Sequence, residues 1–139
     1  METELLQVES SETSDAQAEA LARAVALLRK GGVVAVPTET VYGLAANALD
    51  APAVEAIFAA KQRPAANPVI VHVADEFMAR DCVTEWPATA QALAAAFWPG
   101  PLTLVLPKAD EIPEIVTAGG NTVGVRLPRH PFMQELIRT

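Results

Sequence analysis

Short β-branched runs alternate along this chain with longer stretches that carry apolar residues at helical spacing. Four runs are rich in Val, Leu and Ile and are bounded by Gly or Pro, as buried strands are: 33–36, 69–73, 102–106 and 123–127. Stretches typical of helices separate them. An alternation of this kind predicts an α/β fold with helices flanking an open sheet.

Four helices are expected, over about 14–30, 51–61, 87–97 and from 131 onward. A cap at Ser14 or Asp15 starts the first, and the glycine pair 31–32 stops it. Asp50 caps the second, which delivers Lys61 at its C-terminal end.

The composition predicts one domain, because 51% hydrophobic and 19% charged residues allow a real core. Residues 1–13 are expected to form a polar N-terminal arm, or a short edge strand around Leu5 to Val8, ahead of a domain over 14–139. No run resembles a membrane span or a signal peptide, so cytoplasmic residence is the default expectation. Cys82 is the single cysteine, and no paired Cys or His spacing suggests a zinc site.

The formal charge of −7 argues against a protein that coats nucleic acid by charge alone. Six of the seventeen acidic residues fall in the first nineteen positions, however. Local basic patches can therefore exist on the acidic molecule, around Lys61 with Arg63 and around Arg126 to His130.

Polar side chains follow the first strand directly. The strand stops at Pro37, so the side chains of Thr38, Glu39 and Thr40 emerge at a strand end, where open α/β sheets bind ligands. Lys61 and Arg63 add positive charge suited to phosphate or carboxylate. The natural candidate is an anionic small molecule.

Five motifs occur in a fixed order. They read Gly-Gly-Val-Val-Ala-Val-Pro-Thr-Glu-Thr-Val-Tyr-Gly-Leu (31–44), Lys-x-Arg-Pro (61–64), Asn-Pro-Val-Ile-Val-His-Val (67–73), Trp-Pro-Gly-Pro-Leu-Thr-Leu-Val-Leu (98–106) and Thr-Val-Gly-Val-Arg-Leu-Pro-Arg-His-Pro (122–131). With them the chain resembles the YrdC-like threonylcarbamoyl-AMP synthases over nearly all of residues 20–139. The resemblance implies a twisted, mixed parallel and antiparallel sheet flanked by helices and incomplete at its C-terminal side.

The resemblance also implies a nucleotidyltransferase, L-threonylcarbamoyladenylate synthase. Such an enzyme joins L-threonine, bicarbonate or CO₂ and ATP into threonylcarbamoyl-AMP and releases pyrophosphate. A tRNA threonylcarbamoyl transferase then uses this product to modify adenosine beside the tRNA anticodon. Mg²⁺ is the expected companion of the triphosphate.

Site residues follow from the resemblance position by position. The L-threonine site is implied to use Thr40, His72 and Arg126, with the Arg126 guanidinium as carboxylate clamp. Apart from the resemblance, Thr38 is a candidate for the pocket wall, and Tyr42 is a candidate for either the core or that wall.

The resemblance gives the ATP site to Arg63, Asn67 and Thr122. Catalytic charge stabilisation falls to Lys61 and Arg63, and no protein nucleophile is needed.

Plainer interpretations exist for each motif. His72 taken alone is more often a satisfied structural histidine than a ligand. Residues 38–40 fit an ordinary turn, and Lys61 with Arg63 fits a solvated helix end. Gly119-Gly120 is expected to be a plain turn, and 98–101 a rigid corner.

Three functional alternatives stay open at this point. Complete family members continue into a Ser-Ala-Asn segment that is absent from these residues, so a C-terminally truncated or inactive fragment is one expectation. A YrdC-type carbamoyltransferase domain of hydrogenase maturation is another. A third is a non-catalytic RNA-binding module with weak affinity, which steep salt dependence would reveal.

Overall fold

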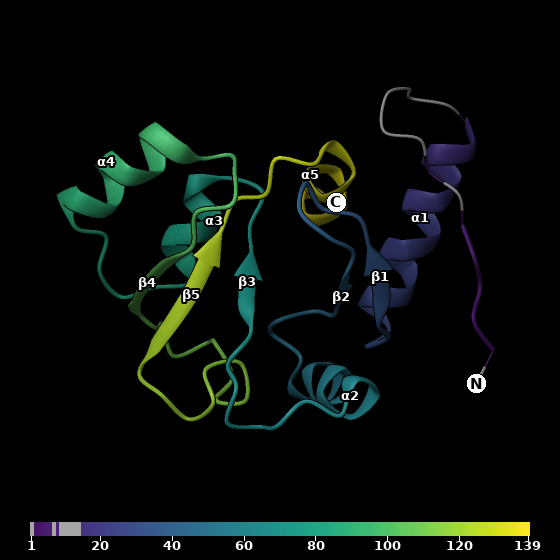
Figure 1. The fold of residues 1–139 in the computed structure, drawn as a ribbon, viewed down its shortest axis with the longest axis horizontal. Helices are drawn as coiled ribbons and strands as arrows, with labels where there is room; N and C mark the ends of the chain where they lie inside the picture. The colour runs from purple at the N-terminus through teal and green to yellow at the C-terminus, as the bar shows by residue number, and fades with distance from the viewer. Residues whose placement is uncertain (1, 7, 9–14) are drawn as a thin grey trace.

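A mixed three-stranded sheet forms the centre of the larger part of the molecule. The computed structural model describes residues 2–6, 8 and 15–139. Strands β3 (Ile70–His72), β5 (Thr122–Arg126) and β4 (Leu104–Pro107) lie in the order β3-β5-β4 (Figure 1). β3 runs parallel to β5, and β4 runs antiparallel to it. The predicted mixed α/β architecture is confirmed.

A second sheet stands apart from the first. It consists of β1 (Val34–Val36) and β2 (Gly43–Ala45), which pair antiparallel. Within the described residues, the first predicted strand thus pairs with β2 and does not join the mixed open sheet. Residues of both β2 and β3 line a cavity, and within the described residues no backbone pairing joins these two strands.

Five helices are present in the described part of the chain. They are α1 (Asp15–Arg29), α2 (Ala51–Lys61), α3 (Glu76–Asp81), α4 (Ala88–Phe97) and α5 (Pro131–Arg138). The four expected helices are confirmed, and the predicted Asp50 cap accepts a hydrogen bond from the N–H of Ala53. The possible Ser14 cap lies outside the described residues.

Two elements escaped the sequence analysis, α3 and β2. α3 has six residues, too few to show helical periodicity, and its start depends on an Asp75 cap. β2 reads Gly-Leu-Ala, a sequence without β-branched residues. The suggested edge strand near Leu5 is not formed by the described residues 2–6 and 8, and Gln7 lies outside them.

Two of the three hydrophobic clusters among the described residues follow the division into two sheets. One packs α2 and α3 against the β3-β5-β4 sheet, with Phe58 and Val125 among its buried members. The other joins α1, α5 and β1 around Val36 and Phe132. Within the described residues, no helix combines the length and apolarity required to cross a membrane.

Candidate functional site

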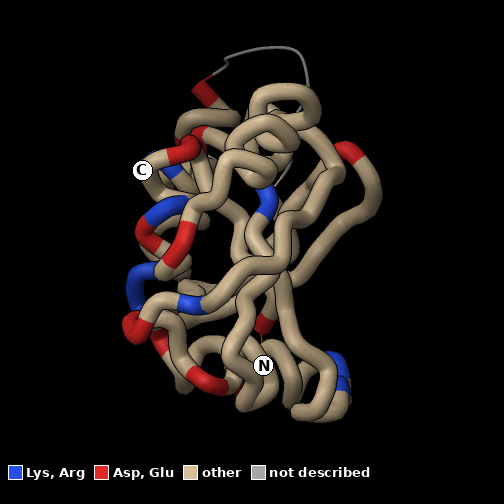
Figure 2. Tube along the Cα trace, turned by 90° about the vertical axis from the view of Figure 1, so that its left-hand side faces the viewer, with Lys and Arg blue, Asp and Glu red and all other residues tan. Residues whose placement is uncertain are grey.

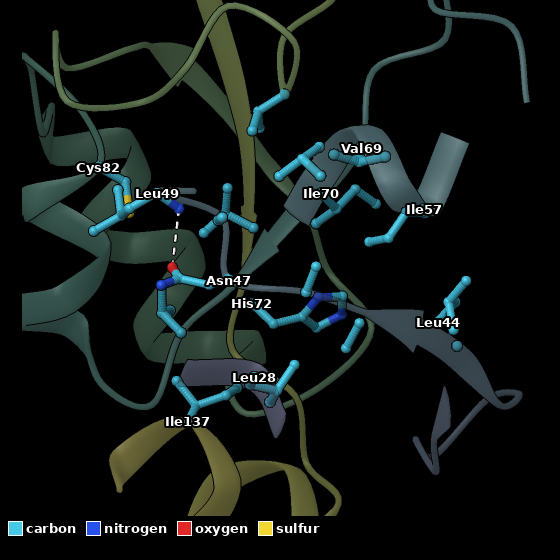
Figure 3. A pocket seen from close by; sticks show the side chains of 18 of the residues that line it. Leu28, Leu44, Asn47, Leu49, Ile57, Val69, Ile70, His72, Cys82 and Ile137 are labelled. Carbon is cyan, nitrogen blue, oxygen red and sulfur yellow. Dashed lines mark hydrogen bonds between the residues drawn. The ribbon is translucent and has the colours of Figure 1, made fainter. Parts of the chain in front are cut away.

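A cavity of about 820 Å³ lies between β2, β3 and α5 and reaches the end of α2. Most of its wall is apolar, from side chains such as Leu44, Ile57 and Ile137 (Figure 3). A few polar side chains interrupt this wall. They include Thr38, Lys61, Arg63 and His72. Concave, largely apolar sites with few polar groups are typical of small-molecule binding.

His72 ends β3 and presents its imidazole among these apolar side chains (Figure 3). Its Nε2 is buried and has no hydrogen-bond partner among the described residues. Burial lowers the pKa of His72, as does the nearby Arg126 charge, although the Glu39 carboxylate partly opposes them. Buried polar atoms in proteins are nearly always paired. The lowered pKa favours the uncharged imidazole, and its Nε2 lacks the partner that a satisfied structural histidine would have.

Arg126 lies directly across the parallel pairing from His72. It is 8% exposed, and its Nε donates to Gly100 O at 3.0 Å. Its Nη2 donates to the carboxylate of Glu39, whose other oxygen accepts from the backbone N–H of Arg129 at 3.3 Å. Burial raises the pKa of Glu39, but hydrogen bonds from backbone N–H groups and from Arg126 outweigh this effect, so the pKa is lowered. Glu39 and Arg126 therefore form a charged pair.

The corner 98–101 supports this pair. Gly100 donates its N–H to Leu127 O at 2.9 Å, and its carbonyl oxygen accepts the hydrogen bond from Arg126 Nε. A Cβ at Gly100 would lie 2.6 Å from the carbonyl oxygen of Phe97, so only glycine fits. The expected rigid corner thus also orients the Arg126 guanidinium.

Glu39 is the residue that sequence reasoning missed. It was noted only as one of three polar side chains after β1 and received no role. The sequence offered one signal, an acidic residue at a strand end in an otherwise neutral motif. Its partner lies 87 positions further along the chain, so only the tertiary structure identifies the pair.

The residues assigned to the nucleotide lie near the starts of β3 and β5, at the ends of these strands opposite His72 and Arg126. Thr122 begins β5, four positions before Arg126, which corresponds to roughly 13 Å along a strand. Asn67 precedes β3; both residues are exposed, and neither lines the cavity. Lys61 is exposed at the end of α2 and does line the cavity.

Arg63 has a structural function that the sequence did not indicate. Its Nε and Nη2 donate to the carbonyl oxygens of Asn67 and Pro68, at 3.3 and 2.7 Å. Its guanidinium also lies over the ring of Phe58, 6.0 Å from the centroid. Arg63 therefore fixes the loop between α2 and β3 while keeping its positive charge at the cavity.

The turn after β1 is organised by Thr38. The Thr38 hydroxyl accepts from the backbone N–H groups of Thr40 and Val41 and lies 3.0 Å from the Thr40 hydroxyl. Thr38 also lines the cavity, whereas Thr40 does not. Tyr42 is 76% exposed and is not part of the cavity wall, contrary to the expectation for that residue.

His72 should make stability depend on pH. Because its pKa is lowered in the folded state, the unfolded chain binds the proton more readily. The contribution of uncharged His72 to the free energy of unfolding is complete above the ordinary pKa of 6.5. It is lost as the pH falls below that value. We expect urea midpoints of the wild type to decline from about pH 7.5 to about pH 5 and the decline to be shallower in His72→Gln. Equal slopes in the two proteins would contradict this.

Comparison with known proteins identifies the family. The family model described as "Sua5_yciO_yrdC: Telomere recombination" matches residues 26–139. The chain belongs to the Sua5/YciO/YrdC family. The resemblance drawn from the five motifs is thereby confirmed.

Relatives in this family share high identity with the chain. The threonylcarbamoyl-AMP synthase of Pyrococcus abyssi is 53% identical over 114 residues, which is 82% of this chain and 34% of that protein. The threonylcarbamoyl-AMP synthase of Bacillus subtilis is 51% identical over 127 residues, covering 91% of this chain and 36% of that protein. The chain thus spans about a third of the length of these relatives.

A solved structure of the family shares the fold. The crystal structure of P. abyssi Sua5 complexed with L-threonine superimposes with a TM-score of 0.84 at 51% identity. The match covers 85% of this chain and 35% of that one. At this identity the Sua5/YciO/YrdC fold of the chain is established.

Proposed function

We propose that this chain carries the L-threonine-binding part, and some of the nucleotide-binding part, of a cytoplasmic threonylcarbamoyl-AMP synthase. The observation that carries the proposal is the unpaired Nε2 of His72 at the cavity, next to the buried guanidinium of Arg126. A neutral imidazole and a fixed guanidinium suit an amino acid that bears a hydroxyl and a carboxylate. The names of the close relatives and the L-threonine complex of P. abyssi Sua5 support this assignment.

The proposed reaction needs positioning and charge more than a nucleophile. Arg126 would hold the carboxylate of L-threonine, and His72 Nε2 would hydrogen-bond its side-chain hydroxyl beside Thr40. The amine would then attack CO₂ with loss of a proton, or bicarbonate with loss of water, and the resulting carbamate would attack the α-phosphorus of ATP and release pyrophosphate. Holding the reactants in this arrangement lowers the barrier by removing the entropy of their encounter.

Lys61 and Arg63 are the proposed partners of the phosphates. The flexible side chain of Lys61 is exposed at the end of α2. Its ammonium group can therefore approach the negative charge that develops on the phosphate oxygens during the transfer. Arg63 contributes a fixed charge, with Asn67 and Thr122 further along the same edge. Within the described residues, no group of three His, Cys, Asp or Glu side chains could hold a metal ion. Mg²⁺ would therefore be held chiefly by the phosphate oxygens and would neutralise their charge.

Calorimetry tests the proposal on this chain directly. We expect L-threonine to bind at least about five-fold more tightly than L-serine, because the extra methyl group contacts the apolar wall. ATP with Mg²⁺ should bind, and Lys61→Ala with Arg63→Ala should weaken it at least about ten-fold. Glu55→Ala, on an exposed position of α2, is a control that should not change either affinity. A folded chain that binds neither ligand would refute the proposal.

The RNA-binding alternative receives no support from the distribution of charge. Figure 2 shows the Lys and Arg positions scattered among Asp and Glu positions, without a continuous basic stripe on the face in view. A protein that binds an RNA backbone needs such a stripe. The transfer of a threonylcarbamoyl group to tRNA would then belong to a separate transferase.

A further inference from the structure

The guanidinium of Arg126 already holds a carboxylate that belongs to the chain. An arginine can grip a carboxylate with two parallel hydrogen bonds only through Nε with Nη2 or through Nη1 with Nη2. Nε donates to Gly100 O, and Nη2 donates to Glu39. Because Nε has a single N–H group, Gly100 O closes the Nε–Nη2 edge, and Glu39 competes with a ligand carboxylate for the N–H groups of Nη2.

Glu39 is held from two sides. Its second oxygen accepts from the backbone N–H of Arg129, so its carboxylate ties the connection between β1 and β2 to the segment after β5. The side chains of Arg126 and Glu39 are only 10% and 20% exposed. The cavity wall includes His72 but neither Arg126 nor Glu39. The paired guanidinium therefore does not contribute to the cavity wall in this arrangement.

We propose that Glu39 is an internal competitor that occupies the carboxylate position of Arg126 until the carboxylate of a ligand displaces it. The proposal deepens the proposed function, because it depends on Arg126 as the clamp for the amino acid. A ligand with a carboxylate replaces the hydrogen bond that Glu39 gives up. A ligand without one leaves the Glu39–Arg126 pair closed, so its affinity does not depend on Glu39.

NMR titration of the wild type and of Glu39→Gln tests this. The probes are acetate, L-threonine and L-threoninol, which keeps the amine and hydroxyl but lacks the carboxylate. We expect Glu39→Gln to bind acetate and L-threonine about three- to ten-fold more tightly, while binding of L-threoninol does not improve. Glu135→Gln is the matched control, because Glu135 pairs with Arg138 on the exposed face of α5 and its substitution should leave all three affinities unchanged. Unchanged or weaker acetate binding by Glu39→Gln would overturn the proposal.

A second readout needs no substitution. Displacement of Glu39 removes the acceptor of the Arg129 amide, so saturating L-threonine should speed hydrogen exchange at that amide in the wild type. Slower exchange would mean that Glu39 stays in place and would also overturn the proposal.

The two proposals fail in different ways. If Glu39→Gln gains acetate affinity but neither protein prefers L-threonine over L-serine, displacement stands and the proposed function fails. If both proteins prefer L-threonine but Glu39→Gln gains nothing, the function stands and displacement fails.

Discussion

Replacing Arg126 by alanine should weaken L-threonine binding by at least about 30-fold and lower the free energy of unfolding by about 2–4 kcal/mol. The affinity should fall because the proposed clamp for the ligand carboxylate, the buried guanidinium at the end of β5, is removed. The stability falls because Glu39 is left without its charged partner and Gly100 O without its donor. Calorimetry gives the affinity, and urea unfolding gives the stability.

Two further variants separate charge from geometry. Arg126→Lys keeps the charge but loses the planar set of donors, so we expect it to recover part of the stability and little of the affinity. Arg138→Ala removes an arginine that is 58% exposed from its ion pair with Glu135 and should cost no more than about 0.5 kcal/mol. If Arg126→Ala binds L-threonine as the wild type does, the clamp lies elsewhere.

Replacing Phe58 by alanine should lower the free energy of unfolding by about 3–4 kcal/mol. Phe58 is 7% exposed in α2 and belongs to the cluster that packs α2 and α3 on the β3-β5-β4 sheet. Its loss opens a cavity in that cluster. It also removes the ring beneath the Arg63 guanidinium, so ATP affinity should fall together with stability.

Phe77 provides the matched control. It is 79% exposed in α3, so Phe77→Ala should change the free energy of unfolding by less than about 0.5 kcal/mol. Phe58→Leu should lie between the wild type and Phe58→Ala, since leucine fills most of the space but offers no ring to Arg63. A loss in Phe58→Ala no larger than in Phe77→Ala would show that this cluster does not hold the sheet.

Local signals in the sequence sufficed for most of the fold. The Asp50 cap and Pro52 define the start of α2, and the β-branched runs define β3 and β5. These signals can be read from the sequence because caps and apolar periodicity act over a few neighbouring residues. α3 and β2 are too short to carry such a signal. The division into two sheets was also beyond local reasoning, because strand pairing depends on residues far apart in the chain.

The candidate site divides in the same way. The sequence by itself determined which chemistry is available: a histidine at the end of β3, an arginine at the end of β5, and polar residues after β1. Only the tertiary structure decided how these groups meet. It pairs Arg126 with Glu39, leaves His72 Nε2 without a partner among the described residues, and commits Arg63 to two loop carbonyls. The physical reason is that hydrogen bonds and ion pairs are set by distance in space, and the segments of this site come together only when the sheet and its corner at Gly100 have formed.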